Sequence, residues 1–194
     1  MALLSTAHAR IVGVLASLAL TGCFSTELTP LEPPSGLEKL EAVSDTTVPI
    51  RLQTNGLQER SLGFQYLFMA IPVSRIYVPH LQSDVRQQLA VAGGLRGYRF
   101  TDASDSSNLL LEITIEELSV NGYDLLVVRK PTSSVTMKAR LSKDGQVIRE
   151  CVESYRSSNS AHYAFAGELQ HALSESLLHG SYKMLDCLGL KGSQ

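Results

Sequence analysis

The clearest alternation of apolar and polar residues lies in the second half of the chain. From Leu109 to Ile115 every second residue is apolar and most of its neighbours are polar, as in a half-buried β-strand. Asn121-Gly122 is the strongest short hairpin pattern in the sequence. We therefore expect a turn there and a second strand from Asp124.

Two further strands follow from the same kind of pattern. Val135–Leu141 alternates strictly and runs into Lys143-Asp144-Gly145, which is typical of a hairpin turn. A return strand is expected from Val147 to Tyr155. These strands predict an antiparallel meander with one polar face, whose other face must be covered by helices.

Helical spacing of apolar residues occurs twice. Leu81, Val85, Leu89 and Ala92 predict an amphipathic helix over Leu81–Leu95. A long C-terminal helix is predicted from about residue 160 by the apolar row Phe165, Leu169, Leu173, Leu177, Met184 and Leu188. These two helices supply the cover that the sheet needs.

The apolar stretch before the first helix allows two interpretations. Phe64–Val78 contains Pro72, which excludes one uninterrupted helix and favours two short extended pieces. They either fill the core or form an exposed surface for a partner or a second copy. The candidate surface residues are Phe64, Tyr66, Phe68, Ile71, Ile76 and Tyr77.

These patterns together predict an α+β fold. We expect a two-layer sandwich in which an antiparallel sheet of three to five strands packs against two helices, one of them long and C-terminal. An additional strand near Val48–Leu52 would open the domain, with Pro49 at a sheet edge or a strand start. Residues 46–194 are expected to form this single domain.

The first 22 residues have the pattern of a secretory signal peptide. Arg10 precedes an apolar run, Ile11–Leu20, that is too short to span a bilayer. Leu20-Thr21-Gly22-Cys23 resembles the lipobox of bacterial lipoproteins at all four positions. The resemblance implies cleavage before Cys23 and a lipid on its thiol. The alternatives are an ordinary secretory cleavage or an uncleaved anchor.

Residues 23–45 are expected to be a lipidated, proline-rich tether. Pro30, Pro33, Pro34 and Gly36 favour an extended chain that could hold the domain roughly tens of ångströms from the bilayer. Phe24 replaces the aspartate that resembles an inner-membrane retention signal. The resemblance therefore points to the inner leaflet of the outer membrane, with the domain facing the periplasm.

The other two of the three cysteines, Cys151 and Cys187, form an even pair in an oxidising compartment. A structural disulfide is the favoured interpretation, and two free buried thiols are the alternative. The chain has no Cys-x-x-Cys motif and no clustered histidines around these cysteines, so a zinc site is not expected.

Composition and motifs argue against several functions. The formal net charge of −2 gives no basic surplus for nucleic acid, and 44% apolar with 19% charged residues suits a folded domain. The sequence lacks Gly-x-Ser-x-Gly, a phosphate-binding loop and a dinucleotide fingerprint. No enzymatic activity and no cofactor beyond the covalent lipid on Cys23 are therefore expected.

For three sets of polar residues we considered a functional role beside a structural one. Glu168 and His171 have metal-bundle spacing but lack the second pair that such sites use, so no metal is expected. Glu116 and Glu117 are adjacent and should point to opposite faces of a strand, which is unsuitable for glycoside hydrolysis. Arg129-Lys130 is interpreted as the charged end of a hairpin, with an anionic-lipid or glycan contact as the alternative.

The order of elements from Val48 to Leu188 resembles YajG-type periplasmic lipoproteins and the ABC-type transport auxiliary lipoproteins. The segments that carry this resemblance are Asp84–Leu89, Arg96–Phe100 and Leu111–Glu116. It implies a non-enzymatic accessory of an envelope transport or assembly system that has an envelope protein as partner, and it includes a homo-oligomer among the expected assemblies. The alternatives are a carrier of lipid or another apolar ligand, and an envelope hydrolase.

Overall fold

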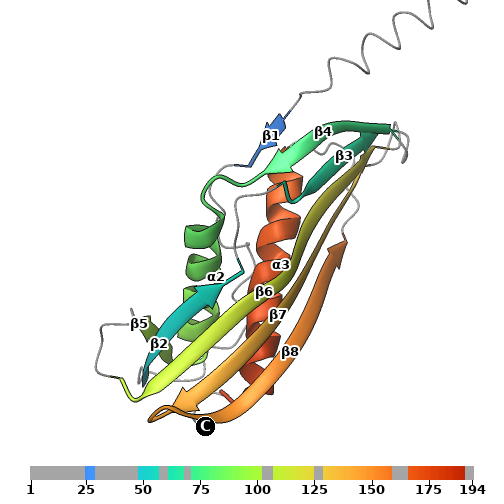
Figure 1. The fold of residues 1–194 in the computed structure, drawn as a ribbon. Helices are drawn as coiled ribbons and strands as arrows, with labels where there is room; N and C mark the ends of the chain where they lie inside the picture. The colour runs from blue at the N-terminus through green and yellow to red at the C-terminus, as the bar shows by residue number, and fades with distance from the viewer. Residues whose placement is uncertain are drawn as a thin grey trace, which may run out of the picture.

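A computed structural model describes residues 25–28, 48–56, 61–67, 71–101, 107–124, 129–158 and 166–190. In chain order, the elements are β1 (Ser25–Glu27), β2 (Val48–Asn55), β3 (Gly63–Leu67), β4 (Ile71–Tyr77), α2 (Leu81–Leu95), β5 (Tyr98–Thr101), β6 (Leu109–Asp124), β7 (Arg129–Lys143), β8 (Gln146–Ser158) and α3 (Ala166–Cys187). Figure 1 shows the strands as a curved sheet, with α2 and α3 packed against it.

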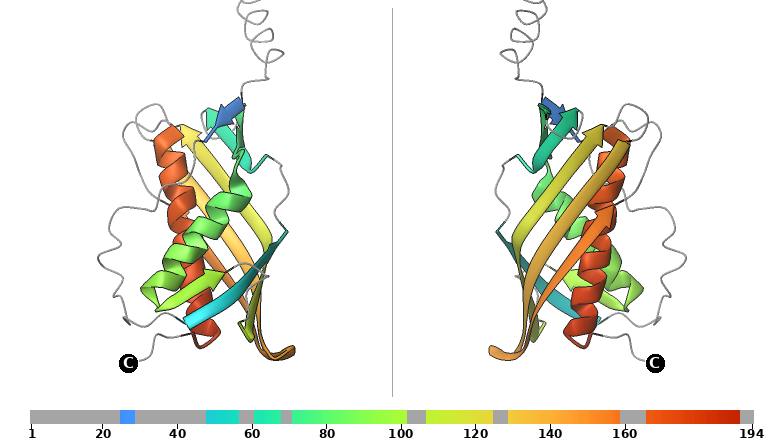
Figure 2. Two further views of the ribbon diagram at one scale, coloured as in Figure 1. Left: turned by 90° about the vertical axis from the view of Figure 1, so that its left-hand side faces the viewer. Right: turned by 90° about the vertical axis from the view of Figure 1, so that its right-hand side faces the viewer.

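Three long strands form the centre of the fold. β6 pairs with β7 and β7 with β8, all antiparallel, and both helices lie on the same side of this meander (Figure 2). The turn predicted at Lys143-Asp144-Gly145 joins β7 to β8. Asp144 and Gly145 have φ values of 51° and 80°, which is the geometry that suits a two-residue hairpin turn.

The predicted antiparallel sheet of three to five strands is wrong. In the described part of the chain the sheet has eight strands. It is mixed, because β2 lies parallel to both β5 and β6, β3 lies parallel to β6, and β1 lies parallel to β4. Parallel pairs join strands that are distant in sequence through crossover connections, so alternation within each strand does not reveal them. Pro49 lies at the start of β2, which is an internal strand.

The turn predicted at Asn121-Gly122 is also wrong, because β6 continues through both residues to Asp124. Gly122 pairs with Pro131 of β7 and with Gln65 of β3. A Cβ atom on Gly122 would lie 3.1 Å from the Leu169 side chain of α3. The glycine therefore permits close packing of helix on sheet, which is the other common role of glycine within a strand.

A bulge in β6 keeps its apolar residues on the helix side. The register with β7 shifts between Ile115 and Glu117, so that buried Ile115 is followed by buried Leu118 and Val120. The prediction that Glu116 and Glu117 occupy opposite faces is wrong, because both are exposed at this bulge.

The core lies between the sheet and the helices. α2 begins and ends where it was predicted, at Leu81 and Leu95, and buries Val85, Leu89 and Ala92. α3 crosses the meander and buries Leu173, Leu177 and Met184 completely. The fully buried residues of β6 and β7 that complete this core include Leu111, Ile113, Met137 and Ala139.

Two neighbouring glycines of α2 should respond differently to alanine. A Cβ on Gly94 would meet nothing within 4 Å, so Gly94→Ala should stabilise the protein by about 0.5–1 kcal/mol through helix propensity. A Cβ on Gly93 would lie 2.6 Å from the Phe100 ring, so Gly93→Ala should destabilise it. Urea denaturation of both variants measures the difference, and equal midpoints would contradict this packing.

Candidate functional site

The predicted lipid-attachment residue, Cys23, lies outside the described residues, as do the signal peptide, Phe24 and most of the proposed tether. These predictions therefore stay predictions. Of the helices in the described part of the chain, neither combines the length and the apolar character needed to cross a membrane.

The residues that follow Cys23 closely are part of the fold, which differs from the expectation of a free tether at this point. Ser25–Glu27 forms β1 beside β4, with Ser25 opposite Arg75 and Glu27 opposite Tyr77. The Leu28 amide donates to the Tyr77 carbonyl at 2.9 Å, and the Leu28 side chain is buried. The chain is thus attached to the sheet edge two residues after Cys23.

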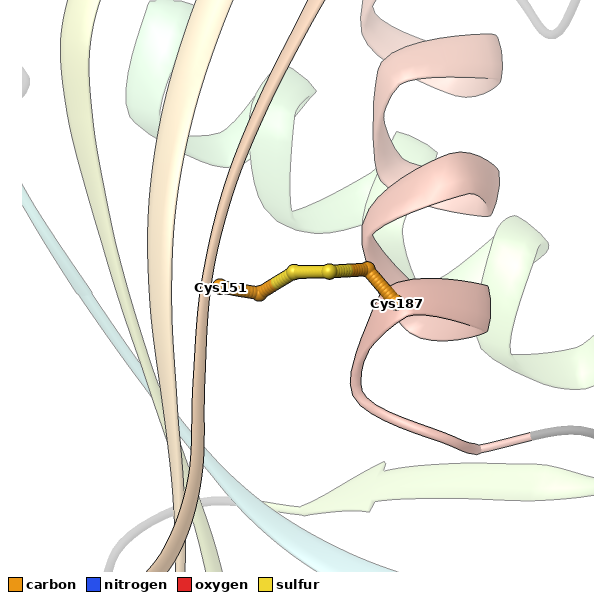
Figure 3. The surroundings of a disulfide bond; sticks show 2 residues. All are labelled: Cys151 and Cys187. Carbon is orange, nitrogen blue, oxygen red and sulfur yellow. A yellow bond between two sulfur atoms is a disulfide. The ribbon is translucent and has the colours of Figure 1, made fainter.

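The predicted cysteine pair is bonded. Cys151 of β8 and Cys187 at the end of α3 form a disulfide between the sheet and the helix (Figure 3). Their Cα atoms are 6.2 Å apart. Cys151 faces the core, whereas Cys187 is exposed. The bond joins the edge strand of the meander to the helix that covers it, so its role is structural.

A charged depression lies beside the disulfide. It has a volume of about 750 Å³ and is lined by Arg96, Glu153, Lys183, Asp186 and Cys187. Buried Arg96 forms an ion pair with Asp186, and its guanidinium lies 3.8 Å from the centre of the Tyr182 ring. These contacts connect the end of α2 to the end of α3.

Potential metal ligands meet at one place among the described residues. Ligand atoms of Cys151, Glu153 and Cys187 lie within 4.8 Å of one another. The two sulfur atoms are bonded to each other, so they are not the thiolates that a zinc site requires. This group therefore gives no support to a metal site.

The histidines and acids of α3 make local contacts. The Ser157 hydroxyl donates to Glu175 at 2.6 Å, and the His179 ring stacks on Tyr155 with centres 5.3 Å apart. Burial raises the pKa of the Tyr155 phenol, and the Glu175 carboxylate raises it further. Glu168 and His171 lie on the same helix, half-buried. These contacts connect α3 to β8 and do not assemble a catalytic triad.

The structure separates the six residues proposed as a partner surface. Ile76 is fully buried and belongs to the core. Phe64, Tyr66 and Tyr77 are half-buried, and Ile71 is exposed. Phe68 lies outside the described residues.

An aromatic cluster at the same end was not predicted as a unit. Tyr66 of β3 and Tyr123 of β6 are register partners, and their rings stack with centres 5.2 Å apart and an angle of 9°. Phe64 lies 6.0 Å from the Tyr66 ring, and the Arg75 guanidinium lies 6.0 Å from the Phe64 ring. Only the parallel pairing of β3 with β6 brings Tyr123 here, so a local pattern could not have found it.

The outer edge of β8 is a second surface that sequence reasoning missed. β8 has 13 residues, and β7 is its only strand neighbour among the described residues. Val147, Ile148 and Val152 of this strand are exposed by 50%, 55% and 56%. The alternation of the return strand was visible in the sequence, but its position at an edge was not.

Comparisons with known proteins give no sequence relative. No family model matches the chain, and no curated protein matches its sequence. Similarity is found to solved structures. Protein XCC0632 from Xanthomonas campestris, described by the family model DUF330, is 10% identical with a TM-score of 0.50, covering 84% of this chain and 93% of that one.

Two more solved structures are similar. An uncharacterized protein is 11% identical with a TM-score of 0.50, covering 84% of this chain and 97% of its own. The minor lipoprotein from Acinetobacter baumannii is 16% identical with a TM-score of 0.41, and the match covers 76% of this chain and 98% of that one. At these identities the first two comparisons concern the fold alone, so the chain is similar in overall fold to a protein of the DUF330 family.

Proposed function

We propose that the protein is a lipoprotein of the bacterial envelope, anchored through Cys23 in the inner leaflet of the outer membrane and facing the periplasm. It acts there as a non-enzymatic accessory or adaptor in a transport or assembly system. The partner is an envelope protein that adds to the outer edge of β8, the edge with which no other described strand pairs. The sequence resemblance to a lipobox supports the anchor, and the exposed edge supports the adaptor role.

The edge of β8 is the single observation that carries the adaptor role. A long strand edge offers a row of backbone donors and acceptors, which natural proteins usually shorten, charge or cover. This edge is long and bears three exposed apolar side chains. A partner strand added here would gain backbone hydrogen bonds and apolar contact, which is a recurring form of peptide recognition.

The interior of the domain gives less support to a carrier of apolar ligands. Leu173, Leu177 and Met184 fill the space between α3 and the sheet and are completely buried. The described depression beside the disulfide is lined mainly by charged residues, which do not suit an apolar ligand. The adaptor is therefore preferred to the carrier.

Cross-linking in intact cells tests this proposal. A photoreactive residue at Ser154, which is exposed on β8, should capture an envelope protein. Val152→Lys should reduce the captured amount at least roughly tenfold, because a partner strand would have to bury an unpaired charge. Val48→Lys is the matched control, since Val48 is similarly exposed, at 43%, on a distant strand.

Two outcomes would contradict the proposal. Equal capture by the two lysine variants would exclude the β8 edge as the docking site. Recovery of bound lipid from the purified protein, with no captured envelope protein, would favour the carrier. Palmitate labelling tests the anchor separately, because Cys23→Ser should abolish it.

A further inference from the structure

We propose that one end of the sheet lies against the surface of an anionic phospholipid bilayer. This end consists of β1, the β3–β4 hairpin and the ends of β6 and β7 that lie beside it. The hairpin-end patch comprises Phe64, Tyr66 and Tyr123 on the outer face, together with the exposed β4 residues Ile71, Val73 and Arg75. The inference rests on the proposed lipid anchor and adds the orientation in which that anchor holds the domain.

The position of β1 determines which end faces the membrane. Two residues of fully extended chain span at most about 7 Å, so a lipid on Cys23 would enter the bilayer no more than roughly 10 Å from Ser25. β1 lies at the same end of the molecule as the β3–β4 hairpin, opposite the β7–β8 turn (Figure 1). The anchor would therefore bring this end, and not the turn, to the membrane.

β1 is attached firmly enough to transmit this constraint. It pairs with β4 over three register positions, and the Thr26 hydroxyl lies 2.8 Å from the Ser74 hydroxyl and 3.2 Å from the Gln65 side-chain oxygen. Leu28 then enters the core. These contacts connect the residues after Cys23 to both β3 and β4, so the lipid would hold the hairpin itself near the bilayer.

The apolar and aromatic side chains of the patch suit a membrane interface. Ile71 and Val73 are exposed by 54% and 40% near the tip of the hairpin. The stacked Tyr66 and Tyr123 rings are half-buried on the neighbouring strands β3 and β6. Ile71 pairs in register with Leu67, so it shares the face of Leu67 at the end of the hairpin. Tyrosine is enriched where membrane meets water, because its ring is apolar and its hydroxyl can stay hydrated.

Two cations in or beside the patch can contact anionic lipid headgroups, and one exposed acid, Glu27 of β1, lies at the same end. Arg75 is exposed and pairs in register with Phe64, so both side chains lie on the same face. Lys130 is exposed and pairs in register with Tyr123 in the same way. Cations beside interfacial aromatic residues attract the negative surface of a leaflet that contains anionic lipids. In this orientation the long β8 edge extends away from the bilayer and stays open to a protein.

The absence of tryptophan from the sequence allows a direct test. Ile71→Trp places one fluorophore in the patch, and Ile148→Trp places one at the opposite end of the sheet. The two native isoleucines are similarly exposed, at 54% and 55%. The full lipidated chain is reconstituted in vesicles of phosphatidylethanolamine and phosphatidylglycerol, with and without brominated acyl chains. Val73→Trp is a second patch probe in case Ile71→Trp does not fold.

The patch tryptophan should be quenched by brominated lipid at least about twofold, because an interfacial residue reaches the acyl boundary. The tryptophan at position 148 should keep its fluorescence. Arg75→Gln combined with Lys130→Gln, or vesicles of phosphatidylethanolamine alone, should reduce the quenching. Equal quenching at both positions, or none at either in vesicle-bound protein, would overturn the inference.

Failure of the anchor gives a different result. A protein without lipid on Cys23 would not sediment with the vesicles, whereas a wrong orientation would leave sedimentation intact and only the quenching absent. If the patch tryptophan is unquenched in bound protein and a photoreactive residue at the same position captures a protein in cells, the patch is a protein-binding surface instead.

Discussion

Replacing Cys187 by serine is expected to lower the free energy of unfolding by about 3–4 kcal/mol. Cys187 and Cys151 are 36 positions apart in sequence, so the disulfide closes a long loop that contains the α3 helix. Cys187 is exposed, so the substitution removes the cross-link without leaving a buried cavity. Urea denaturation under oxidising conditions measures the loss.

A double-mutant comparison separates the cross-link from side-chain packing. Cys151→Ala should cost slightly more than Cys187→Ser, because Cys151 is buried against the core. The double variant should be no less stable than Cys151→Ala alone, since the bond is lost only once. Additive losses, or an unchanged midpoint of the native protein in reductant, would show that the bond contributes little.

Local patterns predicted the elements whose residues contact near neighbours in the chain. The spacing from Leu81 gave both ends of α2, and the turn at Asp144-Gly145 lies where its residues required positive φ angles. β7 and β8 pair directly across that turn. In each case a few adjacent residues determine the backbone, so the sequence is sufficient.

The same patterns failed where distant segments meet. β6 is flanked on one edge by β2 over Leu110–Thr114 and by β3 over Gly122–Asp124, and both partners are parallel to it. Asn121-Gly122 has the composition of a turn, yet Asn121 accepts a hydrogen bond from the Phe64 amide through its side chain. Tertiary pairing therefore outweighed a strong local preference.

The candidate sites show the same contrast between what local patterns predict and what depends on pairing of distant segments. The disulfide between Cys151 and Cys187 was predicted from the oxidising compartment and from the even number of cysteines that remain after Cys23. Neither argument depends on the fold. Sequence reasoning grouped Ile76 with Phe64 because both lie in one apolar stretch, although the two face opposite sides of the hairpin. Tyr123 joined the patch only through the parallel pairing of β3 and β6.

The two proposed surfaces assign different tasks to different parts of one sheet. The hairpin-end patch faces lipid, and the β8 edge is available to a protein some distance from the membrane. β6 and β7, with 16 and 15 residues, pair with each other and connect the two surfaces within one sheet (Figure 1). A partner bound at β8 would therefore be held at a defined orientation to the bilayer.

Gly63→Ala is expected to destabilise the protein by about 3 kcal/mol or more and to detach the β3–β4 hairpin from β6. A Cβ atom at Gly63 would overlap the carbonyl oxygen of Val120, a backbone atom that cannot rotate away. The Val120 amide also donates to the Leu62 carbonyl at 3.0 Å beside this point. Hydrogen exchange should show lost protection in β3 and β4.

Gly122→Ala is the matched control, because its Cβ would meet the movable Leu169 side chain at 3.1 Å, and its cost should be about 1 kcal/mol. Equal stability of the Gly63 variant and the native protein would contradict the close approach of β3 to β6, and with it the base on which the hairpin-end patch stands.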